Sequence, residues 1–159
     1  MERILKILEE NCRITDKEIA TMLSLDESAV ARARAEYEKA GVIMGYKACI
    51  DWDKTEDEST VAMIELKVTP QYGEGFDKIA KRIYDYPEVE SVYLMSGSFD
   101  IMVLIRGRTM KEVAMFVSTK LAPMEAVVST STSFVLKKYK ENGVIFRKEP
   151  DDEREVMGL

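Results

Sequence analysis

A short glycine-containing stretch, Ser96-Gly97-Ser98-Phe99-Asp100, carries the residues with the clearest potential for chemistry. It separates two apolar runs and places a carboxylate beside backbone N–H groups, an arrangement that can hold a small ligand. A structural role is the alternative, because Asp100 can bond the backbone of a tight turn and Gly97 can supply the backbone freedom that such a turn needs. The spacing by itself favours the structural role, and both interpretations stay open.

Catalytic and metal-binding chemistry has little support elsewhere in the chain. The sequence contains no histidine, the side chain that serves most often as a general base and as a metal ligand. Cys12 and Cys49 lie far apart, so neither a zinc site nor a disulfide framework is expected, and a reducing cytoplasm is the predicted location. No carboxylate pair or nucleophile–base set stands out, so we predict no enzyme, no catalytic residue, no metal and no cofactor.

Length and composition predict a globular protein of one or two domains. Of the 159 residues, 46% are hydrophobic and 33% are charged, which is typical of a soluble chain. The net charge of −6 favours solubility and gives no sign of a polyanionic partner. No apolar run approaches the roughly 20 residues of a membrane span, and the N-terminus carries too many charges for a signal peptide, so no membrane partner is expected.

The first 50 residues predict three short helices, followed by short extended pieces. Thr15 stands three residues before Glu18, which is the capping-box pattern that begins a helix, and Gly41 stands where a left-handed residue ends one. The tight turn between the second and third helices favours a helix-turn-helix whose third helix enters the DNA major groove, and a plain three-helix cap is the alternative. From the apolar periodicity, the helices span residues 2–12, 15–23 and 26–40.

An acidic segment, residues 51–60, is typical of a linker, and the pattern changes beyond it. Residues 61–140 predict the ferredoxin-like order βαββαβ, a four-stranded antiparallel sheet with both helices on one face. Residues 141–159 are predicted to be an acidic C-terminal tail, of which residues 144–146 can dock locally. The predicted strands are 61–69, 89–95, 101–105 and 127–139, and the predicted helices run from 75 to 86 and from 109 to Pro123.

The predicted sheet is apolar on both faces. A sheet that helices cover on one side only normally shows a polar second face. In the first strand Ala62, Ile64 and Leu66 alternate with Val61 and Met63, and the third strand is apolar on both sides in the same way. An uncovered apolar face marks a partner surface, so we predict a homodimer in which the sheet of a second copy covers it.

Together, the helix-turn-helix, the linker and the βαββαβ domain resemble the Lrp/AsnC (feast/famine) family of transcription regulators. The resemblance covers residues 2–140 and is carried by the motifs ILKILEENCRITDKEIATMLSLDESAV, PEVESVYLMSGSFDIMVLI and VSTSTSFVL. It implies an α+β fold, with a winged helix-turn-helix DNA-binding domain at residues 1–50 and a ligand-binding and oligomerisation domain at residues 61–140. It also implies a transcription regulator that binds double-stranded DNA, dimerises through its C-terminal sheets and assembles into higher oligomers.

In the family that this chain resembles, a small effector, often an amino acid, binds between dimers at the turn between the second and third strands. The family's Gly-x-aromatic-Asp pattern corresponds here to the turn that ends in Asp100, and threonines of the last strand lie near the same site. Turn N–H groups can meet the carboxylate of an amino acid, and Asp100 or the hydroxyls can meet its ammonium group. Ordinary strand propensity explains the threonines equally well. The predicted effector-binding residues are Ser96, Gly97, Ser98, Phe99, Asp100, Thr130 and Thr132.

The same resemblance places the DNA contacts on and around the third predicted helix. Ser28 and Arg32 match positions that face DNA, and Arg34 stands where the family has an aliphatic residue. Ala33 and Glu36 occupy places where Arg or Lys is usual, so phosphate contacts are expected to be missing there. The predicted DNA-binding residues are Lys17, Ser28, Arg32, Arg34 and Lys39.

One other function stays open beside the regulator, and an enzymatic one is disfavoured. Residues 1–51 carry eight basic and ten acidic side chains, so the helical domain can have lost DNA binding. The chain would then be a small-molecule-binding oligomer that acts through protein partners. Some proteins that resemble the family are decarboxylases of tetrapyrroles, but those rely on histidines, and this chain has none.

Overall fold

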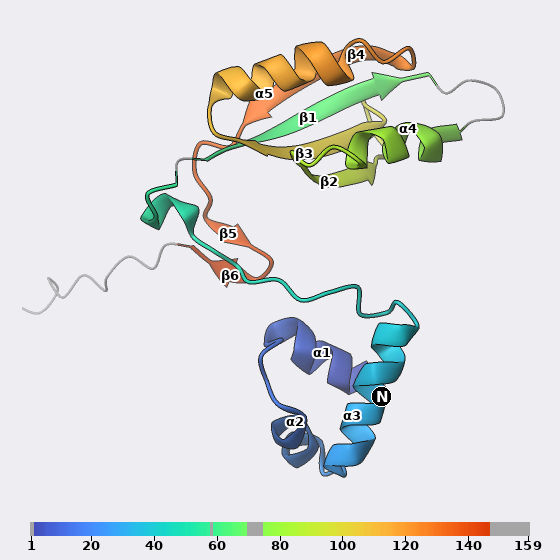
Figure 1. Cartoon of the computed structure of the whole chain (residues 1–159), viewed down its shortest axis with the longest axis vertical. Coiled ribbons are helices and arrows are strands. Elements are labelled where there is room, and N and C mark those ends of the chain that lie inside the picture. Colours follow the sequence, from blue (N-terminus) through green and yellow to red (C-terminus); the bar gives the residue numbers. More distant parts are fainter. Residues whose placement is uncertain (1, 58, 70–74, 147–159) are drawn as a thin grey trace, which may run out of the picture. The chain divides into compact units, whose positions relative to one another are not determined.

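The computed structural model of the chain describes residues 2–57, 59–69 and 75–146 (Figure 1). The described residues form two compact units, one of residues 2–50 with 140–145 and the other of residues 51–139 with 146. Each unit has its own hydrophobic core. None of the helices in this described part of the chain is long and apolar enough to cross a membrane.

Three helices build the first unit, as the sequence predicts. Their apolar faces meet in a core that includes Ile4 and Leu8 of the first helix, Ile19 of the second and Val30 of the third, all buried. Burial of this face holds such short helices together, because isolated helices of this length are marginal in water. The helices are α1 Glu2–Glu10, α2 Asp16–Leu23 and α3 Glu27–Lys39.

The ends of α2 and α3 show how the local sequence sets the helix-turn-helix. The predicted capping box is confirmed: the Thr15 hydroxyl accepts a hydrogen bond from the Glu18 N–H at 3.2 Å, and the Glu18 carboxylate accepts one from the Thr15 N–H at 2.8 Å. Ser24 ends α2 in the left-handed region, and Gly41, with φ of 70°, follows α3 as predicted. Beyond Gly41, the described segment 44–50 contains no helix or strand.

The second unit is the predicted βαββαβ arrangement, with an antiparallel sheet in the order β2-β3-β1-β4 (Figure 1). Both helices pack on one face of the sheet, because their buried residues join one core with the buried residues of β1 and β3. The last helix changes to a π-helical turn over Val117–Leu121. The elements are β1 Thr60–Val68, α4 Gly75–Tyr84, β2 Val89–Leu94, β3 Ile101–Gly107, α5 Met110–Phe116 and β4 Val127–Phe134.

The face of the sheet that the helices leave open is apolar over only part of its area. Met63 of β1 is 38% exposed on this face, and its cross-strand partner Leu104 of β3 is half-buried. On the other side of β1, the residue opposite Met63 is Ser133, and serines recur along this face of β4. The prediction of a second apolar face therefore holds only for Val61 and Met63 of β1 and for Met102 and Leu104 of β3. The same face also carries Glu65, Lys67 and Arg106, and β4 adds a polar border.

Three segments differ from the sequence prediction. The last predicted strand, residues 127–139, ends at Phe134. The predicted linker, residues 51–60, contains a 3₁₀ turn, η1 Trp52–Lys54, and belongs to the second unit. The predicted acidic tail begins with a hairpin of β5 Lys140–Glu141 and β6 Val144–Ile145. Asn142 and Gly143 both have positive φ between these strands, as a type I′ turn requires. The rest of the predicted tail, residues 147–159, lies outside the described residues.

Candidate DNA-binding and ligand-binding sites

The exposed face of α3 brings together three of the predicted DNA-binding residues. Ser28, Arg32 and Lys39 are exposed on the side of α3 away from the buried Val30. Ser28 and Arg32 are one turn apart, and the Arg32 Nε donates a hydrogen bond to the Ser28 carbonyl at 3.3 Å. Lys17 is exposed on α2. Hydroxyl, guanidinium and ammonium groups of this kind can meet base edges and phosphates of a DNA duplex.

Ala33 takes no part in this exposed face. It is 1% exposed and packs in the core of the first unit. The expectation of a missing phosphate contact at this position is therefore wrong, because a side chain at position 33 points into the core. Glu36 is exposed, and it is the acidic residue that follows Arg32 by one helical turn.

The Arg34 guanidinium is directed toward the start of α2. Its Nη2 lies 2.7 Å from the Asp16 Oδ1 and donates a hydrogen bond to the Ile14 carbonyl at 3.1 Å. The side chain is 20% exposed. The structure therefore separates Arg34 from the exposed group of Ser28 and Arg32 and engages it in an ion pair between helices.

The predicted effector turn is held to the neighbouring strand by its aspartate. The Asp100 Oδ2 accepts a hydrogen bond from the Val68 N–H at 2.8 Å, and the Asp100 N–H donates to the Leu66 carbonyl at 2.9 Å. Residues 96–98 are exposed. Among the described glycines, positive φ occurs at Gly41, Gly75 and Gly143, so the expectation that Gly97 is needed for its backbone freedom is wrong.

The two threonines of β4 lie one strand beyond this turn. Thr130 pairs with Leu66 and Thr132 pairs with Ile64, so both lie on the same sheet face as the buried residues of β1. Because β1 lies between β3 and β4, about two strand spacings, roughly 10 Å, separate Thr130 from β3. The turn and the threonines thus share one end of the sheet, and β1 separates them.

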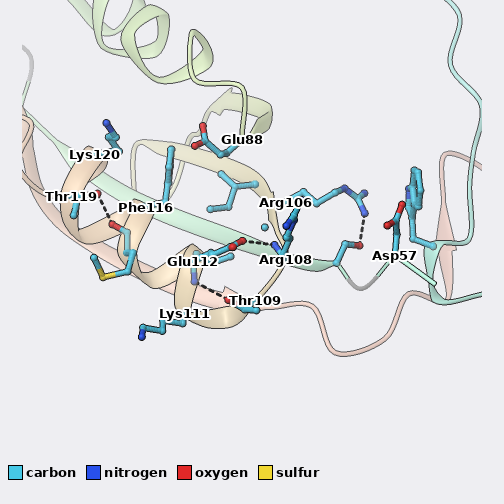
Figure 2. Close-up of a pocket in the computed structure, with 16 residues that line it drawn as sticks. Asp57, Glu88, Arg106, Arg108, Thr109, Lys111, Glu112, Phe116, Thr119 and Lys120 are labelled. Carbon is cyan, nitrogen blue, oxygen red and sulfur yellow. Dashed lines mark hydrogen bonds between the residues drawn. The ribbon is translucent and has the colours of Figure 1, made fainter. Parts of the chain in front are cut away.

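A pocket of about 900 Å³ lies at the opposite end of β3, and the sequence analysis did not predict it (Figure 2). Its lining combines apolar side chains with charges of both signs, which suits a small polar ligand with an apolar part. No local spacing could reveal it, because the lining comes from three separated parts of the chain. These are the segment before β1, which contributes Trp52, Asp57 and Ser59, then Glu88, and the segment from Ile105 to Lys120, which includes Arg108, Lys111, Glu112 and Phe116.

Hydrogen bonds fix the walls of this pocket. The Arg106 guanidinium pairs with Glu90 at 2.5 Å and donates to the Ser59 hydroxyl at 2.9 Å, and it lies 5.8 Å from the centre of the Trp52 ring. The Glu112 carboxylate accepts a hydrogen bond from the Arg108 N–H at 2.8 Å (Figure 2). Residues that precede β1 are thereby tied to the end of β3. Within the described residues, no group of three or more metal-ligating side chains occurs.

Two family descriptions match the sequence. The "Lrp/AsnC ligand binding domain" matches residues 61–145, and a "Winged helix-turn-helix DNA-binding" domain matches residues 2–44. The HTH-type transcriptional regulator YugG of Bacillus subtilis (strain 168) is 50% identical over 155 residues, which cover 97% of this chain and 93% of that protein. The HTH-type transcriptional regulator FL11 of Pyrococcus horikoshii is 30% identical over 140 residues, 88% of this chain and 89% of that protein.

Solved structures show the same architecture. The transcriptional regulator NMB0573 of Neisseria meningitidis, solved as a complex with L-Met, is 26% identical, with a TM-score of 0.71 over 87% of this chain and 88% of that one. AsnC of E. coli is 17% identical, with a TM-score of 0.67 over 87% of this chain and 91% of that one, a likeness that concerns the fold alone.

Proposed function

The chain belongs to the Lrp/AsnC family of transcription regulators, and from this premise we propose that it binds operator DNA through α3 and responds to an amino-acid effector. It is a transcription regulator and not an enzyme, because its family consists of regulators. The observation that carries the DNA-binding proposal is the exposed group of Ser28, Arg32 and Lys39 on one side of α3.

DNA binding by this group is expected to be weak per subunit. Arg32 and Ser28 would meet base edges, and Lys17 and Lys39 would meet phosphates. Glu36 opposes them with a negative charge, and we expect dimers to compensate through two linked contacts. We propose homodimers that pair their open sheet faces and assemble into higher oligomers, in the cytoplasm.

A titration of double-stranded DNA at low salt tests the DNA-binding proposal. A duplex selected from a random library by the wild-type protein is the probe, and fluorescence anisotropy is the measurement. Arg32→Ala is expected to weaken binding by about 1–3 kcal/mol, whereas Lys6→Ala, an exposed lysine of α1, leaves it within a few tenths of a kcal/mol. Failure to select or bind any duplex would contradict the proposal.

We further propose that the effector is an amino acid. The complex of the Neisseria meningitidis relative with L-Met supports this class of ligand. Two places in the second unit can receive it: the turn at Ser96–Asp100, with Thr130 and Thr132 nearby, and the pocket of Figure 2. The pocket is favoured by its size and by its lining, which combines apolar side chains with charges of both signs, and the turn is favoured by the family resemblance.

The single tryptophan distinguishes these two places. Trp52 lines the pocket, whereas the turn lies at the other end of β3. A thermal-shift screen of the amino acids identifies the ligand, because a ligand that binds only the folded state raises the melting temperature. Binding in the pocket is expected to change Trp52 fluorescence and to be weakened by Arg108→Ala. Binding at the turn is expected to leave the fluorescence unchanged and to be weakened by Ser98→Ala.

Effector binding would act on DNA by changing how dimers pack, and with that the spacing of the DNA-binding units. A second function is favoured by the excess of acidic over basic side chains in residues 1–51: a small-molecule-binding oligomer that acts through protein partners. This alternative predicts that an effector shifts the melting temperature while no duplex is bound. Loss of duplex binding in Arg32→Ala, with the melting temperature unchanged, would exclude it.

A further inference from the structure

We propose that Arg34 is a positioning residue of the helix-turn-helix, which holds α2 against α3 and touches no DNA. The inference rests on the proposed DNA-binding function and assigns Arg34 a role different from that of Arg32, two residues earlier. Three observations carry it: the partners of the guanidinium, its burial, and its place beside the chain that leaves α3.

The partners of Arg34 lie at the start of the neighbouring helix. Asp16 is the first residue of α2, and Ile14 lies two residues before it, just ahead of the capping residue. The Arg34 Nη2 contacts both, at 2.7 Å from the Asp16 Oδ1 and 3.1 Å from the Ile14 carbonyl oxygen. The guanidinium of Arg34, in the middle of α3, therefore contacts both a backbone carbonyl and a carboxylate side chain at the start of α2.

Both charges are largely shielded from water. The side chains of Arg34 and Asp16 are 20% and 27% exposed. The Arg34 Nε is buried and, within the described residues, makes no hydrogen bond, so the contacts to Asp16 and Ile14 are made by Nη2. Loss of either partner leaves the other charge partly buried without its counter-charge, which destabilises the junction more than loss of a surface pair would.

Arg34 also lies beside the segment that follows α3. The Tyr46 hydroxyl donates a hydrogen bond to the Glu38 carboxylate at 2.8 Å. Desolvation and then Glu38 raise the Tyr46 pKa, and the neighbouring Arg34 opposes this rise. The Arg34 side chain thus lies where the start of α2, the body of α3 and residue 46 meet, on a different side of α3 from Ser28 and Arg32.

Salt dependence separates a positioning arginine from a DNA-contacting one. Each phosphate that a protein neutralises adds roughly 0.9 to the slope of log K against log salt. An arginine that contacts phosphate therefore contributes to that slope, and removal of the arginine makes the slope less steep. A positioning arginine changes how well the other contacts fit, so its removal weakens binding at every salt concentration with the slope unchanged.

The experiment uses the full chain and the duplex selected by the wild-type protein, with Kd measured from low to moderate NaCl concentrations. Arg34→Met is compared with Arg32→Met, which is the matched control because it makes the same chemical change on the exposed face. We expect Arg34→Met to bind roughly 2- to 30-fold more weakly at every salt concentration with an unchanged slope. Arg32→Met is expected to bind more weakly, and the slope of log K against log salt is expected to fall by about 0.9.

Asp16 provides a second measurement that removes no cation. Asp16→Asn is expected to weaken DNA binding like Arg34→Met, and the double variant is expected to be no weaker than Arg34→Met, because both changes break one pair. Arg34→Lys keeps the charge, but its shorter side chain places the ammonium short of the position of Nη2 between Asp16 and Ile14, so we expect it to bind as weakly as Arg34→Met. This variant also covers the case in which Arg34→Met does not fold.

Several results would overturn the inference. A slope that falls by about one in Arg34→Met, together with wild-type binding by Asp16→Asn or Arg34→Lys, would make Arg34 a phosphate contact. A wild-type protein that selects no duplex would overturn the proposed function and this inference with it. The two outcomes are distinguishable, because the wild-type protein still binds DNA if only the inference about Arg34 fails.

Discussion

Glu36 is the residue where the charge of α3 opposes DNA binding most directly. It is exposed one helical turn after Arg32, so it would lie near the phosphates that basic residues of α3 contact. Ala33, by contrast, is a core residue, and its position requires no basic replacement. Of the two positions where a basic residue was expected, only Glu36 therefore offers a side chain whose replacement can add a phosphate contact.

Glu36→Lys is expected to strengthen DNA binding and to add about 0.9 to the salt slope, because it exchanges a repulsive charge for a phosphate contact. Anisotropy titrations over a range of NaCl concentrations measure both quantities. Glu10→Lys, which makes the same charge change at an exposed position of α1, is the control. An equal gain in the two variants would show that net charge, and not the place of Glu36, limits binding.

At the scale of elements, the capping box decides where α2 begins. Thr15→Ala removes the hydroxyl that accepts the Glu18 N–H, and we expect it to destabilise this helix start by about 1 kcal/mol. Amide hydrogen exchange in α2 is the measurement. Thr21→Ala is the control, because the Thr21 hydroxyl bonds within the same helix, to the Lys17 carbonyl, and caps nothing. Equal effects of the two variants would contradict the cap.

The same box makes α2 sensitive to acid. Hydrogen bonds from the Thr15 backbone N–H, and then from its hydroxyl, lower the Glu18 pKa below its ordinary value of 4.5. Because the folded pKa is depressed, this contribution to stability is present above pH 4.5 and is lost as the pH falls through the lower folded pKa. In Thr15→Ala, carboxylate NMR titration is expected to show a Glu18 pKa that is higher than in the wild type. This pKa still lies below its ordinary value, because the hydrogen bond from the residue 15 backbone N–H remains.

Gly97, in the turn before β3, and Gly107, the last residue of β3, differ in how much they matter for stability. A Cβ at Gly107 would come within 3.1 Å of the Val113 side chain, which is buried in the core, whereas a Cβ at Gly97 would meet nothing within 4 Å. Gly107→Ala is expected to destabilise the second unit by about 1 kcal/mol or more, because the buried valine has little room to move. Gly97→Ala is expected to be nearly neutral. Thermal unfolding followed by Trp52 fluorescence compares them, and equal losses would contradict the prediction.

At the scale of the whole molecule, the open sheet face sets the expected assembly. Leu104→Asp puts a charge in its apolar area beside Met63, and we expect the proposed dimer to dissociate. Size-exclusion chromatography with light scattering measures the mass. Met110→Asp, at an exposed position at the start of α5, is the control. An unchanged mass for Leu104→Asp, or equal dissociation of both variants, would place the interface elsewhere.

The local sequence predicted most of the fold. Helical periodicity and the Thr15–Glu18 box located α1 to α3, and strand alternation located β1 and β3 to within about two residues. The Asn142-Gly143 pair, a strong short-range hairpin signal, was present in the sequence and was overlooked beside the acidic residues that follow it. These features depend on neighbours in the chain, so one segment is enough to predict them.

The sequence by itself determined the order of elements and the family. Only the tertiary structure decided which partner each polar side chain takes: Asp16 for Arg34, the Val68 N–H for Asp100, and three separate segments for the pocket. The physical reason is range. Periodicity and capping act over a few residues, whereas the reach of a guanidinium or a carboxylate is set by which distant segments the packing of the core brings beside it.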